Sequence, residues 1–345
     1  MAGDEITVSE LGERALIERI AQRLPPAPEG EVWSGDDAAV LNSPGPRLLC
    51  STDAMVEAVD FDVSYSTAYD IGWKALAINV SDVAAMGGRP VHAVVSVGLK
   101  PQTDVVFVDD LVAGMAAAAA RWGVALVGGD ISRARELSVT VAIIGVAPDG
   151  RAVSRTGAGV GDAICVTGAL GGAAAGLLAL QRRMEAAPDD VALGRALTRL
   201  VSRQRRPQAR VEAGQLLGAL GATAMIDVSD GLARDLGNLL HASLVGCDVD
   251  ADAVPIDDDV RVLARALSDE SVDPLTLALA GGEDFELLFT IDPRVVQEIR
   301  STLRDDELDV TRIGSVTAGS ARIGGRDLSR WEELGWDHLR ARRDC

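Results

Sequence analysis

Apolar residues in the first half of the chain follow two periods, which predict helices and strands in turn. Between Tyr69 and Met86 they recur at helical spacing, whereas between Val91 and Leu99 every second residue is apolar. A run of prolines from Pro25 to Pro28 ends the first helical pattern. The elements expected in this half are helices at Leu11–Leu24, Tyr69–Met86 and Val108–Arg121, and strands at Leu48–Thr52, Val91–Leu99, Ala125–Val127 and Leu137–Val146.

The second half repeats this mixture after a segment rich in Gly, Pro and Ser, Pro148–Gly161, which we interpret as the domain boundary. Its expected elements are strands at Ala163–Thr167, Thr223–Asp227 and Phe285–Ile291, and helices after Gly171-Gly172, near Val191–Ser202, at Pro207–Leu220 and at Leu232–Leu240. A length of 345 residues also favours two domains over one. We therefore predict an α/β (α+β) protein in two lobes, with an N-terminal helical segment (1–30) and domains at 31–149 and 150–345.

Composition narrows the class of protein. Hydrophobic residues make up 48 % and charged residues 25 %, as in a soluble globular protein, and the net charge of −19 argues against nucleic acid or an anionic membrane as partner.

The longest apolar stretch, Leu111–Val127, is interrupted by Arg121 and predicts a helix followed by a strand, not a membrane span. The N-terminus lacks a signal-peptide pattern, so the cytoplasm is the expected location. No C-x-x-C pair occurs among the four cysteines, Cys50, Cys165, Cys247 and Cys345, which indicates neither a zinc site nor a disulfide framework.

The candidate chemistry lies in carboxylates at strand ends and glycine-rich turns. They occur in six motifs: Gly35-Asp36-Asp37, Ser51-Thr52-Asp53, Asn79-Val80-Ser81-Asp82, Gly128-Gly129-Asp130, Asp227-Val228-Ser229-Asp230-Gly231 and Gly281-Gly282-Glu283-Asp284. If these carboxylates converge, their like charges need cations to neutralise them. Oxygen ligands suit Mg²⁺ or Mn²⁺, so the motifs predict a site for such an ion.

Each motif also has a purely structural interpretation. Asp230 could cap a helix, while Asp36-Asp37 and Asp130 could belong to turns. Asp82 could be a surface residue of an amphipathic helix, although it shares a face with Asn79 that differs from the apolar stripe and so can point at a site. The occurrence of six such motifs, mostly after strands, favours a shared site.

Other signatures of phosphate chemistry are missing from the sequence. Neither Lys74 nor Lys100 follows a glycine, which excludes a Walker A loop, and no H-R-D, D-F-G or V-A-I-K motif of protein kinases occurs. The glycines at 157, 159 and 161 have the wrong spacing for a dinucleotide fingerprint. The histidines are isolated and no serine lies in a G-x-S-x-G context. A carboxylate site with glycine loops remains, which suits phosphoryl transfer by electrostatics and positioning.

In combination and order, seven motifs resemble the thiamine-monophosphate kinase family, within the aminoimidazole ribonucleotide synthetase superfamily. They are Gly35-Asp36-Asp37-Ala38-Ala39, Ser51-Thr52-Asp53, Asn79 to Gly87, Gly128-Gly129-Asp130, Ser154-Arg155-Thr156-Gly157-Ala158, Asp227 to Leu232 and Gly281 to Phe285. The resemblance implies two α/β lobes, the N-terminal mixed sheet pairing with its counterpart in a homodimer to form a barrel, with ATP near that lobe.

The resemblance also implies roles for individual residues. Metal-binding positions are matched by Asp37, Ser51, Thr52, Asp53, Asp82, Asp130, Asp227 and Asp230. ATP-contacting positions are matched by Gly129, Asp130, Arg155 and Ser229, and substrate-contacting positions by Glu283 and Trp336. Asp60 stands where the family often has a substrate-associated histidine, and could instead face the cationic thiazolium. Trp336 could stack on that ring or simply anchor the C-terminal segment.

The activity implied is transfer of the ATP γ-phosphoryl group to thiamine monophosphate, giving thiamine diphosphate and ADP with several Mg²⁺ ions. The acceptor is a phosphate monoester with a second pKa of about 6, so it is largely ionised and needs no general base. The obstacle is repulsion between phosphates, which bridging Mg²⁺ would lower. This agrees with a chain rich in Asp that offers no obvious catalytic His or Lys.

Three alternatives stay open. Another synthetase of the superfamily is one, although residues 1–35 lack the Cys and Lys expected of selenophosphate synthetase, and Cys345 lacks the Pro-Arg-Ile-Cys context of the hydrogenase-maturation relative. We expect Cys345 to be dispensable. A non-catalytic nucleotide-binding regulator is the second alternative, and a divalent-cation-binding protein is the third.

Overall fold

The computed structural model describes residues 6–11, 13–29, 31, 42–43, 47–148, 151–267, 272–304, 308–333 and 335. The chain divides into two compact units, one of Met1–Ala84 with Gly88–Ala152 and the other of Ala85–Gly87 with Val153–Cys345. The change of unit after Ala152 falls within the Gly-, Pro- and Ser-rich segment. Among the described residues, none of the helices is both long and apolar enough to cross a bilayer.

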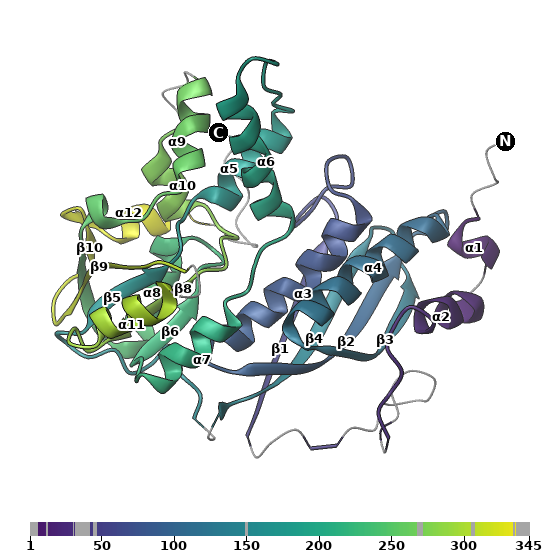
Figure 1. The fold of residues 1–345 in the computed structure, drawn as a ribbon, viewed down its shortest axis with the longest axis horizontal. Helices are drawn as coiled ribbons and strands as arrows, with labels where there is room; N and C mark the ends of the chain where they lie inside the picture. Colours follow the sequence, from purple (N-terminus) through teal and green to yellow (C-terminus); the bar gives the residue numbers. More distant parts are fainter. Residues whose placement is uncertain are drawn as a thin grey trace. The chain divides into compact units, whose positions relative to one another are not determined.

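The first unit is built on a four-stranded mixed sheet in the order β1-β4-β2-β3 (Figure 1). Strand β2 pairs antiparallel with β4 and parallel with β3, and β1 pairs antiparallel with β4. The elements are α1 (Val8–Leu11), α2 (Glu13–Ala21), β1 (Leu48–Val56), α3 (Ala68–Ala85), β2 (Arg89–Leu99), α4 (Val105–Trp122), β3 (Ala125–Arg133) and β4 (Ser138–Val146). The helix predicted at Leu11–Leu24 corresponds to α2, α1 was not predicted, and β1 and β3 are longer than the predicted strands.

Helices α3 and α4 pack closely because each carries a glycine at the contact. A Cβ on Gly72 of α3 would lie 2.0 Å from the carbonyl oxygen of Leu111, and one on Gly114 of α4 would lie 2.0 Å from that of Tyr69. Only residues without a side chain permit this approach.

The two faces of the first sheet differ in burial. On β4, Val139, Val141 and Ile143 are fully buried, and Gly145 lies on the same face, where an added Cβ would contact Val83 of α3. The residues between them, such as Ile144, are only half-buried. Strand residues alternate between faces, so one face packs on the helices and the other keeps partly exposed side chains.

The second unit is built on a seven-stranded mixed sheet in the order β11-β10-β7-β9-β5-β8-β6. Its strands are β5 (Ala163–Thr167), β6 (Ala224–Asp227), β7 (Gly246–Val249), β8 (Leu287–Ile291), β9 (Val310–Thr317), β10 (Arg322–Ile323) and β11 (Arg326–Asp327). Its helices are α5 (Gly172–Gln181), α6 (Val191–Arg205), α7 (Val211–Ala219), α8 (Leu232–Ser243), the 3-10 helix η2 (Ala251–Ala253), α9 (Asp258–Leu267), α10 (Pro274–Ala280), α11 (Val296–Arg304) and α12 (Ser329–Glu332). Strands β7 and β9–β11 and helices α9–α12 were not predicted from the sequence.

The central strands of this second sheet bury both faces. Consecutive residues of β5, such as Ile164 and Cys165, belong to two different core clusters, and Leu288 and Phe289 of β8 divide in the same way. One cluster includes apolar residues of α8 and α10, and the other includes residues of α7 and α11. The α/β fold with two domains, each with a mixed sheet, is therefore confirmed.

Candidate active site

The Ser-Thr-Asp motif of β1 and the Asn-Val-Ser-Asp motif of α3 meet through hydrogen bonds. The Ser51 hydroxyl donates to the Asp82 carboxylate, and the backbone N–H of Asp53 donates to Asn79 Oδ1 at 3.0 Å. Asn79 is fully buried, and its amide donates to the Ala75 carbonyl at 3.0 Å. Residues three apart share a helix face, as do alternate residues of a strand, so Ser51, Asp53 and Asp82 gather at one place.

Thr52 lies on the other face of β1. Its hydroxyl donates to the Val141 carbonyl at 2.9 Å, within the sheet. Strand alternation separates this side chain from those of Ser51 and Asp53. A role for Thr52 as a metal ligand stays a prediction.

Asp60 supports the turn that follows β1. Its carboxylate accepts the backbone N–H of Val56 at 2.8 Å, in a turn where Ala58 takes a left-handed φ of 66°. This contact gives Asp60 a structural role. Its contact with substrate stays a prediction.

Gly129 and Asp130 lie on β3, at the opposite edge of the sheet from β1. The pairing register aligns Asp53, Val141, Val95 and Gly129 in one row across the four strands, so Asp53 and Gly129 are about 14 Å apart at the usual strand spacing. The structure of one chain therefore does not bring Asp130 beside Asp53. A Cβ on Gly129 would lie 2.0 Å from the Val95 carbonyl oxygen, which gives this glycine a packing reason of its own.

In the second unit, β6 ends at the buried Asp227, and the loop to α8 carries Ser229 and Asp230. Asp235, in the first turn of α8, holds this loop because its Oδ2 accepts the backbone N–H groups of Ser229 and Asp230, both at 3.0 Å. Burial, together with the charges of Asp227 and Asp230, raises the pKa of Asp235 well above its usual value. Sequence reasoning missed Asp235, although an acidic residue in the first turn of a helix is a signal that could have found it.

The Gly-Gly-Glu-Asp motif packs against this loop. The backbone N–H of Glu283 donates to the Ser229 carbonyl at 2.8 Å, and that of Phe285 donates to the Val228 carbonyl at 2.9 Å. The side-chain amide of Gln204 in α6 donates to the Glu283 carboxylate. Predicted ATP-contacting and substrate-contacting residues, Ser229 and Glu283, are thereby neighbours.

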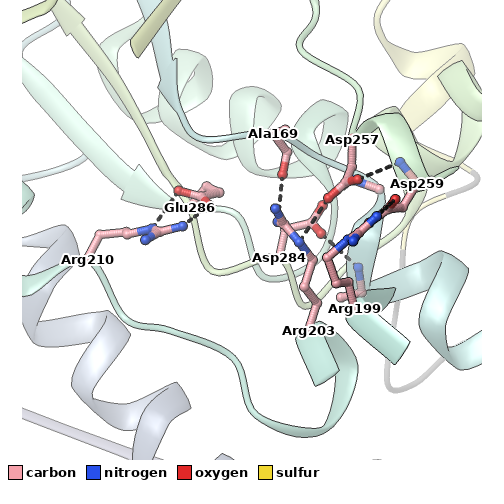
Figure 2. A network of polar contacts seen from close by, with 10 residues as sticks. Ala169, Arg199, Arg203, Arg210, Asp257, Asp259, Asp284 and Glu286 are labelled. Atoms are coloured by element: carbon pink, nitrogen blue, oxygen red, sulfur yellow. Dashed lines mark hydrogen bonds and ion pairs between the residues drawn. The ribbon is translucent and has the colours of Figure 1, made fainter. Parts of the chain in front are cut away.

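Asp284 of this motif and Glu286, which follows Phe285, are both buried, and Figure 2 shows each of them bound to other residues of the protein. Asp284 accepts the backbone N–H groups of Gly171 and Ala173 at the start of α5, at 2.7 and 3.1 Å. Its burial raises the pKa of the carboxyl to about 7. Glu286 accepts from the Arg210 guanidinium, Nε to Oε2 at 2.8 Å. Asp284 belonged to one of the six acidic motifs, but the family resemblance gave neither side chain a role.

Three other residues that the sequence assigned to the site are Arg155, Asp37 and Trp336. Arg155 is exposed, and its backbone carbonyl accepts the Ser243 hydroxyl at 3.0 Å. Asp37 and Trp336 lie outside the described residues. Their roles, and the ATP contact of Arg155, stay predictions.

Metal binding can be examined for the described part of the chain. No group of three or more His, Cys, Asp or Glu side chains there is placed to hold a metal ion by itself. The carboxylates instead form small sets, such as Asp53 with Asp82 in the first unit and Asp227 with Asp230 in the second. Mg²⁺ commonly uses only one or two carboxylates and takes its other ligands from water and substrate phosphates, so these oxygen donors fit that ion together with a nucleotide.

Comparison with known proteins gives matches along most of the chain. Residues 35–147 match the N-terminal domain of AIR synthase related proteins, and residues 159–324 match the C-terminal domain. The thiamine-monophosphate kinase of Escherichia coli (strain K12) is 37 % identical over 333 residues, which cover 95 % of this chain and 98 % of that protein.

Two solved structures extend the match to three dimensions. The crystal structure of thiamine-monophosphate kinase from Stenotrophomonas maltophilia K279a has a TM-score of 0.79 at 34 % identity, covering 90 % of this chain and 96 % of that one. The structure of AaThiL complexed with AMPPCP and TMP has a TM-score of 0.75 at 31 % identity, covering 98 % and 100 %. This chain belongs to the thiamine-monophosphate kinase family, among the AIR synthase related proteins.

Proposed function

We propose that this chain is an ATP-dependent kinase that phosphorylates thiamine monophosphate to thiamine diphosphate. The observation that carries this function is the near-complete correspondence with thiamine-monophosphate kinases, such as the E. coli protein, which spans both units. A related structure binds AMPPCP and TMP, an ATP analogue and the acceptor.

The acceptor's chemistry explains what the protein has to do. A phosphate monoester has a second pKa of about 6, so its attacking oxygen is largely ionised at neutral pH without a general base. Attack in line with the leaving ADP then depends on alignment and on neutralising the charge of two phosphate groups. Oxygen-rich motifs without a catalytic histidine suit this reaction.

We assign Mg²⁺ binding to the carboxylate and hydroxyl sets, with Asp53 and Asp82 as the main candidates in the first unit and Asp227 and Asp230 in the second. When bound, Mg²⁺ would supply positive charge that offsets the repulsion between the two phosphate groups. Ser51 orients the Asp82 carboxylate by its hydroxyl, and Asp235 keeps the Ser229–Asp230 backbone in place. The remaining predicted ligands are Asp37, Thr52 and Asp130. Because each described set is small, we expect tight Mg²⁺ binding only when ATP is present.

The ATP and substrate contacts are also proposals. Gly129, Asp130, Arg155 and Ser229 are assigned to ATP, and Asp60, Glu283 and Trp336 to thiamine monophosphate. The hydrogen bond between Glu283 and the Ser229 carbonyl supports the nearness of the two groups. A location in the cytoplasm stays a prediction.

A homodimer that closes the first sheet into a barrel is part of the proposal. It is supported by the second face of that sheet, which carries Leu48 at 53 % exposure and Val94 at 41 %. Both residues lie on the sheet face opposite the buried Val139, Val141 and Ile143. A second copy of the chain would bury them.

The direct test is to incubate the protein with Mg-ATP and thiamine monophosphate and to separate the products by chromatography. We expect thiamine diphosphate and ADP in equal amounts, none after chelation of Mg²⁺, and a loss of at least about 100-fold in kcat for Asp53→Asn. Asp248→Asn, which alters an exposed carboxylate on β7, is the matched control and should stay active.

The alternatives give different results in the same experiment. ATP binding without any ADP would favour a non-catalytic regulator, and Mg²⁺ affinity that is independent of ATP would favour a cation-binding protein. A folded, ATP-binding protein that forms no thiamine diphosphate would reject the kinase and favour another synthetase of the superfamily.

A further inference from the structure

The loop that carries Arg155 is tied by hydrogen bonds to strand β6 and to helix α8. The Ser154 carbonyl accepts the backbone N–H of Met225 in β6 at 3.0 Å, and the Arg155 carbonyl accepts the Ser243 hydroxyl at 3.0 Å. The Ser243 hydroxyl oxygen also accepts the backbone N–H of Ala158 at 3.2 Å. Ser243, in the last turn of α8, therefore bridges two positions of this short loop.

These contacts fix the backbone of Arg155 on both sides. A peptide unit is planar, so the direction of a side chain depends on the φ and ψ rotations between the two planes that flank it. Met225 holds the plane before Arg155, and Ser243 holds the plane after it. With both planes held, the Cα–Cβ bond of Arg155 has one direction.

The residues that follow Arg155 pack closely against the same elements. Gly157 has a φ of 123°, a conformation that favours glycine, and a Cβ there would lie 2.4 Å from the Thr223 carbonyl oxygen, just before β6. Ala158 is buried and belongs to the same core cluster as Leu240 of α8. The loop is thus seated on the two elements that hold its hydrogen bonds.

The hydroxyl of Ser243 bonds outside its own helix. A Ser or Thr in a helix can donate to the carbonyl four residues earlier, as Thr302 of α11 does to Glu298. Ser243 instead donates to the Arg155 carbonyl, and α8 ends directly after it at Leu244, whose φ of 57° is left-handed. The end of this helix therefore holds the loop by a side chain.

The side chain of Arg155, unlike its backbone, has no partner among the residues that the structure describes. It is exposed and forms no hydrogen bond or ion pair with them, whereas Arg199, Arg203 and Arg210 of the same unit are each paired with a carboxylate. A guanidinium is a strong donor to phosphate oxygens. A fixed backbone below such a guanidinium suits a residue that binds the phosphates of a ligand.

We propose that Ser243 is a positioning residue for ATP binding, which fixes the backbone of Arg155 so that its guanidinium meets the phosphates of the nucleotide. This inference rests on the proposed function, in which Arg155 contacts ATP. Both hydrogen bonds of the Ser243 hydroxyl go to the Arg155 loop. Its loss should therefore weaken binding of ATP and leave binding of thiamine monophosphate unchanged.

The test compares the wild type with Ser243→Ala and with Ser301→Ala, a control in which the lost hydroxyl donates within its own helix, to Glu298. We expect KM for ATP to rise about three- to tenfold in Ser243→Ala, the range of one net hydrogen bond. KM for thiamine monophosphate and the midpoint of thermal unfolding should stay near those of the wild type. Ser301→Ala should match the wild type throughout.

A double variant separates positioning of Arg155 from general packing. Arg155→Gln should raise KM for ATP at least as much as Ser243→Ala does. The combination should raise it no further than Arg155→Gln alone, because both changes remove the same contact. An unchanged KM for ATP in Ser243→Ala, an equal rise for both substrates, or additive effects in the double variant would overturn the proposal.

Direct binding of AMPPCP with Mg²⁺, measured by isothermal titration calorimetry, separates failure of this inference from failure of the proposed function. If the wild type binds AMPPCP but forms no thiamine diphosphate, the kinase assignment falls, and weaker AMPPCP binding by Ser243→Ala would still support the positioning role. If the wild type is active and Ser243→Ala binds AMPPCP as tightly as the wild type, only the positioning role is rejected.

Discussion

The two sheets of this protein bury their apolar residues differently. In the second unit, consecutive residues of β5 and β8 enter two separate cores, one on each face of the sheet. In the first unit, β4 buries Val139, Val141 and Ile143 completely, while Leu48 and Val94 on the other face of the sheet keep about half of their surface exposed.

This difference indicates which unit can be complete in one chain. A sheet with helices on both faces has no apolar surface left to cover, whereas a sheet with helices on one face presents the other to solvent or to a partner. The second unit thus resembles a self-contained domain. The first unit has the surface expected of a subunit interface, which is why we place the proposed homodimer there.

The largest expected effect is in the second core. Phe289 is fully buried on β8, so Phe289→Ala should lower the free energy of unfolding by about 3–5 kcal/mol through lost burial and a residual cavity. Urea denaturation followed by circular dichroism would measure it. Val191→Ala, at a position 59 % exposed, is the control and should change stability by less than about 0.5 kcal/mol.

A smaller loss of stability is expected when a side chain is introduced at the contact between helices α3 and α4 of the first unit. Gly72→Ala places a methyl group 2.0 Å from the Leu111 carbonyl oxygen and should destabilise the fold by about 1–3 kcal/mol, because α3 and α4 must move apart. Gly194→Ala on α6 meets its nearest atom at 3.6 Å and should be neutral or slightly stabilising. Equal unfolding midpoints for the two variants would contradict this account of the helix contact.

A third prediction concerns how buried carboxyl groups titrate. Burial raises the pKa of Asp284 to about 7, whereas the hydrogen bond from Lys100 lowers the pKa of Glu57 in the first unit. Between pH of about 4 and 7, the folded protein holds a proton on Asp284 that the unfolded chain has released. The contribution of Asp284 to the free energy of unfolding therefore falls as pH rises, by up to about 1.4 kcal/mol per pH unit.

Asp284→Asn removes this titration. Relative to the wild type, the variant should lose less stability between pH of about 4 and 7, and above pH 7 the two curves should run parallel. Urea titrations at several pH values would measure the difference. Parallel curves over the whole range would show that Asp284 does not carry a raised pKa.

The smallest change in stability is expected at the partly exposed face of the first sheet. A substitution there should instead change the oligomeric state. Val94→Glu replaces a residue that is 41 % exposed, so a single chain should lose less than about 0.5 kcal/mol. A charge buried at the subunit contact should instead dissociate the dimer. Analytical ultracentrifugation would report half the mass, and Val160→Glu, at an exposed position of the second unit, should leave the mass unchanged. A wild type that is already monomeric would reject the homodimer.

Residue patterns located most elements of the first unit but not their full lengths. Strand β1 continues past Asp53 to Val56, and β3 continues past Gly128-Gly129-Asp130 to Arg133, because the backbone there still pairs with β4 and β2. Backbone pairing does not depend on apolar side chains, so hydropathy alone ends such strands too early. In the second unit, the two-residue strands β10 and β11 are too short to give any period.

The candidate site, too, was predicted only in part from the sequence. The motif resemblance singled out Ser51, Asp53 and Asp82, and the structure joins Ser51 to Asp82 and the Asp53 backbone to Asn79 of the same helix. The motifs could not show that the Thr52 side chain lies on the other face of β1 from Ser51 and Asp53. They also could not show that Asp235 accepts hydrogen bonds from the backbone of the Ser229–Asp230 loop. These are contacts between side chains and backbone groups whose distance depends on how the elements pack.

By itself, the sequence determined the family, the oxygen-donor chemistry and the alternation of helices and strands, because these follow from residue types and local spacing. The tertiary structure decided which carboxylates are bound by arginine or by backbone amides and which sets of them lie together. It also decided that Asp53 and Gly129 lie on opposite edges of one sheet. The physical reason is that strand order and register join residues far apart in the chain, and local periodicity carries no information about either.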